Sequence, residues 1–174
     1  APLSKWLNEI DPEIDFQTRN AKKLFKSEAI FKAIQDLPPI SSTGNVETLD
    51  NPDGGLRLHV WGDRSWPMVI SRPERAILEF LDEIPTHQSF EHAAELFTGL
   101  SNLSPRQLQA SLENCGSVKV NRLFLWFAER NDHAWFKRLD LDAINIGSGK
   151  RVVAKGGKLD AKYQITVPEG LDGN

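Results

Sequence analysis

The chain has 174 residues, of which 40% are hydrophobic and 26% charged, and its net charge is −3. This composition is that of a globular protein with one core of ordinary size, and it excludes a disordered chain or two large domains. No apolar run is long enough to span a membrane, and the first residues lack the basic-then-apolar order of a signal peptide. The single cysteine, Cys115, excludes an internal disulfide and a four-cysteine zinc site. We therefore expect a cytoplasmic protein without membrane contact.

Charge is unevenly distributed along the chain. Residues 103–168 contain eleven basic and six acidic side chains, a net charge of +5, whereas the remainder contains ten basic and eighteen acidic ones, a net charge of −8. Such an asymmetry is typical of a protein that presents a polyanion-binding surface beside an acidic body. A chain divided in two also shows some imbalance by chance, so the asymmetry favours a nucleic-acid function without establishing it.

The first part of the chain is predicted to be rich in β-structure. Alternating apolar residues indicate a half-buried strand over 14–18, and a loose helical spacing indicates a helix over 24–37. Turn-forming residues predict a surface loop over 38–55. Two further extended runs, 56–60 and 67–70, predict an antiparallel pair of strands.

Four helices are predicted between residues 71 and 131, because apolar side chains recur there with a spacing of about 3.6 residues. Capping boxes are expected at 71–74 and 104–107, where Ser is followed three residues later by Glu or Gln. Gly116 is expected to end the third helix in a left-handed cap. The fourth helix, around 120–128, is apolar on nearly all sides, so we expect it to be the central one.

After the fourth helix the sequence predicts a short helical turn over 135–141 and then a hairpin. Residues 151–155 and 159–167 alternate with a period of two, and Gly156-Gly157 between them fits a two-residue turn. The expected fold class is α+β, with a small sheet from the N-terminal strands and the C-terminal hairpin packed against four or five helices. We divide this one compact domain into a β-rich part, 1–70, and a helical core with a basic hairpin, 71–174.

Signals of catalysis are weak. The glycine-rich run 147–151 lacks the spacing of a nucleotide-binding P-loop, which leaves an anion-binding nest or an ordinary turn as its interpretation. The four histidines show no metal-ligand spacing. Cys115 lies at a helix C-terminus, where the helix dipole opposes a thiolate. We expect no enzyme activity, and we nominate no catalytic residue, metal ligand or cofactor.

Basic residues give a better candidate site. Lys119, Arg122, Trp126 and Arg130 share one face of the fourth helix, where cations could contact phosphates and Trp126 could stack on a base. Alternatively, Arg122 and Arg130 cover Trp126 by cation–π contact at the surface.

The predicted hairpin places like charges opposite one another, with Arg151 facing Lys162 and Lys155 facing Lys158. Directly opposed like charges destabilise a strand pair, and a bound polyanion would relieve this repulsion. Helix and hairpin together are therefore expected to form one phosphate-tracking surface. The candidate residues are Lys119, Arg122, Trp126, Arg130, Lys137, Arg138, Lys150, Arg151, Lys155, Lys158 and Lys162.

The same regions carry a resemblance to a known family. The segments concerned are 71–79, 112–125, 147–151, Gly156-Gly157 and 163–168. They resemble the AbiEi-type antitoxins, and the resemblance is strong over 71–168. It implies a bacterial transcriptional regulator and antitoxin of a type IV toxin–antitoxin, abortive-infection system. The implied partners are operator DNA and a nucleotidyltransferase toxin, which such an antitoxin opposes without a stable complex.

Members of that family pair an N-terminal winged helix-turn-helix with a C-terminal antitoxin domain, and we find no winged helix ahead of Trp6. We therefore expect a C-terminal antitoxin domain without its own promoter-reading part. A second hypothesis is a protein-interaction module whose acidic part binds a toxin or a second copy. A nucleic-acid-processing enzyme is disfavoured, because no acid–base or metal set is visible.

Overall fold

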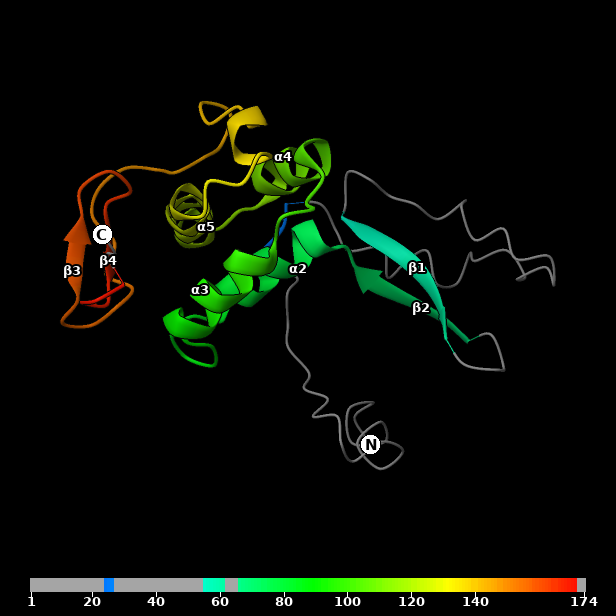
Figure 1. Cartoon of the computed structure of the whole chain (residues 1–174), viewed down its shortest axis with the longest axis horizontal. Coiled ribbons are helices and arrows are strands. Elements are labelled where there is room, and N and C mark those ends of the chain that lie inside the picture. Colours follow the sequence, from blue (N-terminus) through cyan, green and yellow to red (C-terminus); the bar gives the residue numbers. More distant parts are fainter. Residues whose placement is uncertain (1–23, 27–54, 62–65, 172–174) are drawn as a thin grey trace.

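The computed structural model describes residues 24–26, 55–61 and 66–171 (Figure 1). The predicted strand over 14–18 and nearly all of the predicted helix and loop between 24 and 55 lie outside the described residues. The three residues 24–26 are not helical, because Phe25 forms an isolated antiparallel bridge with Cys115. In the described part of the chain, no helix is both long and apolar enough to cross a membrane.

The α+β class expected from the sequence is confirmed. The strands form two separate antiparallel pairs, β1–β2 and β3–β4, instead of the single small sheet that was expected. Figure 1 shows the two pairs on opposite sides of the helices. The described elements are β1 (Leu56–Trp61), β2 (Trp66–Ser71), α2 (Pro73–Asp82), α3 (Phe90–Gly99), α4 (Pro105–Asn114), α5 (Val118–Arg130), the 3-10 turn η3 (Phe136–Arg138), β3 (Lys158–Asp160) and β4 (Ile165–Val167).

Helix α5 is the centre of the fold, as its sequence predicts. Every residue from 120 to 128 is buried, and α2, α3 and β4 all pack against this helix. The ring of Phe97 on α3 stacks on Phe127 at 5.1 Å and lies 5.4 Å from Phe124, measured between ring centroids. Each buried side chain of this size stabilises the fold by about 1.5–3 kcal/mol relative to exposure.

Both predicted capping boxes are wrong. Arg72, not Ser71, occupies the N-cap of α2, and the Ser71 hydroxyl donates to Glu79 Oε2 at 2.7 Å. Ser104 is the N-cap of α4 but its side chain makes no capping bond. The backbone N–H of Ser104 donates instead to Glu74 Oε1 at 2.7 Å. A carboxylate on one helix therefore anchors the start of another, a long-range contact that local sequence patterns do not contain.

The end of α4 also differs from the expected left-handed glycine cap. The C-cap is Cys115 in an extended conformation. Gly116 donates its N–H to the Leu24 carbonyl at 2.6 Å, and Lys26 donates its N–H to the Asn114 carbonyl at 2.9 Å. The helix thus ends because a strand-like partner, residues 24–26, takes up its last backbone groups.

These caps predict that two similar substitutions lower the free energy of unfolding by different amounts. The Ser89 side chain accepts a hydrogen bond from the His92 N–H at 3.1 Å, so Ser89→Ala should lower the free energy of unfolding by about 1 kcal/mol. Ser104→Ala should change it by no more than about 0.5 kcal/mol, because no capping bond is lost. Urea denaturation followed by circular dichroism measures both values. Equal losses for the two variants would contradict these cap assignments.

Candidate nucleic-acid interface

The C-terminal hairpin has a different register from the predicted one. Lys158 pairs with Val167 and Asp160 with Ile165, so the turn of the hairpin is 161–164 and not Gly156-Gly157. Arg151 forms a parallel bridge with Ile165. Since neither expected pair of opposed cations exists, the repulsion argument for a polyanion at the hairpin is wrong.

Local contacts explain both why the hairpin turns at 161–164 and why glycine occupies position 157. Asp160 Oδ1 accepts a hydrogen bond from the Tyr163 N–H at 2.8 Å, which closes the turn three residues on. Gly157 has no space for a side chain, because a Cβ there would collide with the Val167 carbonyl. Gly157 is therefore needed for close approach of the backbone to β4. Gly156, with φ of +74°, does lie in a turn, but this turn leads from residue 154 toward β3 and does not close the hairpin.

Arg122 lies in the interior, contrary to its predicted place on an exposed basic face. The residue is 2% exposed. Its Nε donates to the Ile146 carbonyl at 2.5 Å, and its Nη1 donates to the Gly149 carbonyl at 2.6 Å and the Gln164 carbonyl at 3.1 Å. Burial, and then the nearby positive charge of Arg151, lower the pKa of the Arg122 guanidinium.

The glycine-rich loop wraps around this arginine. Gly147 and Gly149 adopt left-handed backbone conformations, with φ of +58° and +74°, which turn the loop so that the carbonyls of Ile146 and Gly149 face Arg122. The Gly147 N–H is taken up by Asn145 Oδ1 at 3.0 Å. The loop therefore presents carbonyl oxygens to a cation of its own chain, which disfavours the anion nest considered for 147–151.

Trp126 is also buried, at 1% exposure, and is not available to stack on a base. Its indole N–H donates to Asp160 Oδ2 at 3.1 Å. The Arg130 guanidinium lies 3.8 Å from the Trp126 ring centroid and 3.6 Å from the same carboxylate. The cation–π alternative is thus correct for Arg130, whereas Arg122 points elsewhere. Together, the contacts of Trp126 and Arg130 with Asp160 attach the hairpin to α5.

Several other candidate cations are paired within the chain. Lys162 bonds to Glu129, and Lys137 lies 2.9 Å from Asp132 at the surface. Lys119 Nζ donates to the carbonyls of Asp82 and Ile84 at the end of α2, at 2.5 and 2.9 Å, and lies 3.6 Å from the Asp82 carboxylate. Lys119 therefore caps a neighbouring helix, a structural role that its position in the sequence did not reveal.

The remaining cations are concentrated in one segment. Lys150, Arg151, Lys155 and Lys158 are exposed and follow one another within nine residues; we call 150–158 the basic segment. In the described part of the chain, Lys150, Arg151 and Lys155 have no carboxylate partner. Arg138 is exposed on η3, outside this segment.

The backbone of the basic segment is fixed against β4. Arg151 donates its N–H to the Gln164 carbonyl at 2.8 Å and accepts from the Thr166 N–H at 3.1 Å. Val153 and Ala154 bond to Thr166 as well, through its hydroxyl at 2.9 Å and its carbonyl at 3.1 Å. Arg151 is therefore carried on an ordered extended backbone, with Lys150 and Lys155 on either side of the fixed residues 151–154.

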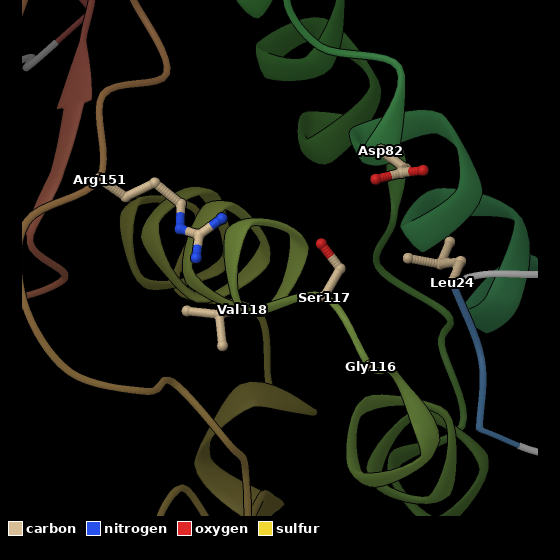
Figure 2. Close-up of a pocket in the computed structure, with 6 residues that line it drawn as sticks. All are labelled: Leu24, Asp82, Gly116, Ser117, Val118 and Arg151. Atoms are coloured by element: carbon tan, nitrogen blue, oxygen red, sulfur yellow. The ribbon is translucent and has the colours of Figure 1, made fainter.

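An open hollow of about 340 Å³ lies between the basic segment and the end of α2. Figure 2 shows Arg151 on one side of it and Asp82 on the other, with Ser117 between them. Its lining residues are Leu24, Asp82, Gly116, Ser117, Val118 and Arg151. No sequence pattern pointed to Asp82 or Ser117, because the hollow joins segments that are distant along the chain.

Chemistry at the neighbouring cysteine is disfavoured. Burial raises the pKa of the Cys115 thiol to about 11, so the thiol stays protonated at neutral pH. Among residues 24–26, 55–61 and 66–171, no three His, Cys, Asp or Glu side chains gather in a way that could hold a metal ion. The arrangement offers cations for binding rather than groups for acid–base or metal chemistry.

The contacts of Arg122 predict a large effect on stability. Arg122→Met removes the donor from three carbonyls and should lower the free energy of unfolding by about 3 kcal/mol or more. Arg122→Lys should recover less than half of this loss, because an ammonium cannot reproduce the planar fork of the guanidinium. Chemical denaturation tests both variants, and an unfolding free energy unchanged in Arg122→Lys would contradict the assigned contacts.

The attachment of the hairpin to α5 can be followed through Tyr163, the only tyrosine of the chain. Its hydroxyl donates to Glu129 Oε2 at 3.1 Å. Burial, and then the Glu129 charge, raise its pKa from 10.0 to about 12. Because the folded state holds this proton more tightly than the unfolded state, the stabilising contribution is complete below pH 10 and is lost between pH 10 and about 12.

Ultraviolet titration of the phenolate should therefore give a midpoint near 12 in the native protein. Glu129→Gln should lower that midpoint, because the repelling carboxylate is removed. A native midpoint at the ordinary value of 10.0 would show that Tyr163 is not held in this environment.

The chain is similar to one family of known proteins. Residues 2–168 match the family described as transcriptional regulators, AbiEi antitoxins of type IV toxin–antitoxin systems. No curated protein and no solved structure matches the chain. The matched residues include the described helices α2 to α5, the glycine-rich loop around Arg122 and the C-terminal hairpin. The chain belongs to the AbiEi-type family of antitoxin transcriptional regulators from type IV toxin–antitoxin systems.

Proposed function

We propose that this chain is a non-catalytic antitoxin regulator that contacts the phosphate backbone of nucleic acid through the basic segment, 150–158. The observation that carries the proposal is the concentration there of Lys150, Arg151 and Lys155, exposed and without carboxylate partners in the described chain. Most of the other cations first considered either lie in the core or are paired. The contact surface is therefore smaller than the one expected from the sequence.

The order of the backbone favours binding through this segment. Since the hydrogen bonds to β4 already fix residues 151–154, binding does not have to order the backbone, and only the side chains lose freedom. Contacts of this kind go to phosphates, so they give affinity and orientation rather than base specificity. The binding should accordingly weaken steeply with salt.

Family membership supports a partnership with a toxin. We propose that this toxin is a nucleotidyltransferase, that the antitoxin opposes its effect in the cytoplasm without a stable complex, and that the nucleic acid includes operator DNA. In this scheme the antitoxin acts on the nucleic acid or its products, so loss of phosphate contacts should weaken neutralisation of the toxin.

The test is a matched pair of triple variants. Lys150→Gln, Arg151→Gln and Lys155→Gln together should weaken binding to duplex DNA and lower the slope of log affinity against log salt by about 3, roughly one unit per lost contact. The control combines Arg106→Gln, Lys137→Gln and Arg138→Gln, which remove the same charge from exposed positions outside the segment. Fluorescence anisotropy over a range of salt concentrations gives both slopes.

The two triple variants also separate the proposal from the interaction-module hypothesis in cells. Loss of toxin neutralisation in the basic-segment variant, with neutralisation retained by the control, supports nucleic-acid contact. Full neutralisation by a correctly folded basic-segment variant would contradict it and favour a protein-binding antitoxin. Equal losses in both variants would show that only the overall charge matters.

A further inference from the structure

Two arginines from distant parts of the chain meet at one carbonyl oxygen. Arg122 Nη1 donates to the Gln164 carbonyl at 3.1 Å, and the backbone N–H of Arg151 donates to the same oxygen at 2.8 Å. Gln164 adopts a left-handed conformation, with φ of +53°, at this point. The Arg122 side chain and the Arg151 backbone are therefore linked through one carbonyl of the turn.

This arginine pair carries a charge that the described chain does not neutralise. Arg122 is buried and bonded only to carbonyl oxygens, and neither arginine forms an ion pair within the described residues. Buried charges in proteins are normally paired with an opposite charge. Burial, and then the positive charge of Arg151, lower the pKa of Arg122, so the second cation repels the first. An anion beside Arg151 would relieve this repulsion.

The hollow next to Arg151 can accept such an anion. The Arg151 side chain lines it, on the side opposite Asp82 (Figure 2). The acidic group on the opposite side, Asp82, has Lys119 at 3.6 Å, which offsets its charge. The first turn of α5 is already capped by Ser117, which accepts from the Val120 N–H at 3.4 Å. Among the residues that line the hollow, the cation is Arg151.

We propose that this hollow binds a phosphate group, whose oxygens Arg151 contacts while Arg122 attracts the anion from the interior without touching it. The planar fork of a guanidinium matches two phosphate oxygens, which a lysine at the same place does not. This inference rests on the proposed function, because nucleic acid is the source of the phosphate. The group is either a phosphodiester within a strand or the phosphate at a strand end.

Single substitutions in the full chain test the site. Arg151→Gln and Lys155→Gln remove one exposed cation each from the same segment. Arg151→Gln should weaken oligonucleotide binding about tenfold, as expected for a charge-assisted contact, and Lys155→Gln only about two- to threefold. Arg151→Lys should recover only part of the loss. Circular dichroism verifies that the variants fold.

Inorganic phosphate provides a probe that does not depend on nucleic-acid binding. Phosphate should raise the melting temperature of the wild-type chain above that in chloride of equal ionic strength, and Arg151→Gln should abolish the difference while Lys155→Gln retains it. Oligonucleotides with and without a 5′ phosphate distinguish the sources: tighter binding of the phosphorylated strand identifies a strand end, and equal binding identifies a phosphodiester.

Three results would overturn the inference. Equal losses of binding in Arg151→Gln and Lys155→Gln would show that Arg151 has no special site, and would leave the wider role of the basic segment intact. A phosphate effect on melting that persists in Arg151→Gln would place the anion elsewhere. Absence of oligonucleotide binding by the wild-type chain at low salt would reject the proposed function together with this site.

Discussion

The buried guanidinium of Arg122 joins the three parts of the C-terminal half. It extends from the central helix α5 and bonds to the glycine-rich loop at Ile146 and Gly149 and to the hairpin turn at Gln164. These acceptors lie 24 to 42 residues further along the chain. Because a single planar group satisfies all three, the loop and the hairpin are fixed relative to α5 and to each other. The position of the basic segment depends on this arrangement.

The same contacts explain which segments carry the family resemblance. Residues 112–125 contain Arg122, 147–151 contain the loop that surrounds it, and 163–168 contain the turn that supplies its third acceptor. Segments that are separate in the sequence are therefore parts of one interaction. The glycines of the loop allow the backbone conformation in which its carbonyls face Arg122. This role explains why 147–151 is rich in glycine, like a nucleotide-binding P-loop, but lacks the P-loop spacing.

The structure also divides the cations by role. Arg122, Arg130, Lys119 and Lys162 stabilise contacts between elements. By contrast, Lys150, Arg151 and Lys155 are exposed and have no carboxylate partner in the described chain. A surface that binds phosphate needs cations without internal partners, so this division matters more than the total charge of +5 in residues 103–168. The proposed phosphate group beside Arg151 would offset the positive charges of Arg151 and of the buried Arg122.

Features that depend on contacts local in the sequence could be predicted, and features that depend on contacts between distant residues could not. The four helices and the central place of α5 were predictable, because a 3.6-residue apolar spacing is local and α5 carries it on nearly all sides. The same feature should have warned that Arg122 and Trp126 on that helix are buried, since a helix apolar on all sides leaves no exposed face. The hairpin register, the contact of Glu74 with Ser104 and the partner of Cys115 were not predictable, because each depends on residues distant in sequence.

The most direct test of the central claim is a backbone amide NMR titration of the intact chain with duplex DNA. If the basic segment is the contact surface, the largest changes in amide chemical shift fall on residues 149–158 and on the adjoining turn at Gln164. The amide chemical shifts of α3 and α4 then do not change. Changes concentrated on those two helices, with the basic segment unaffected, would contradict it.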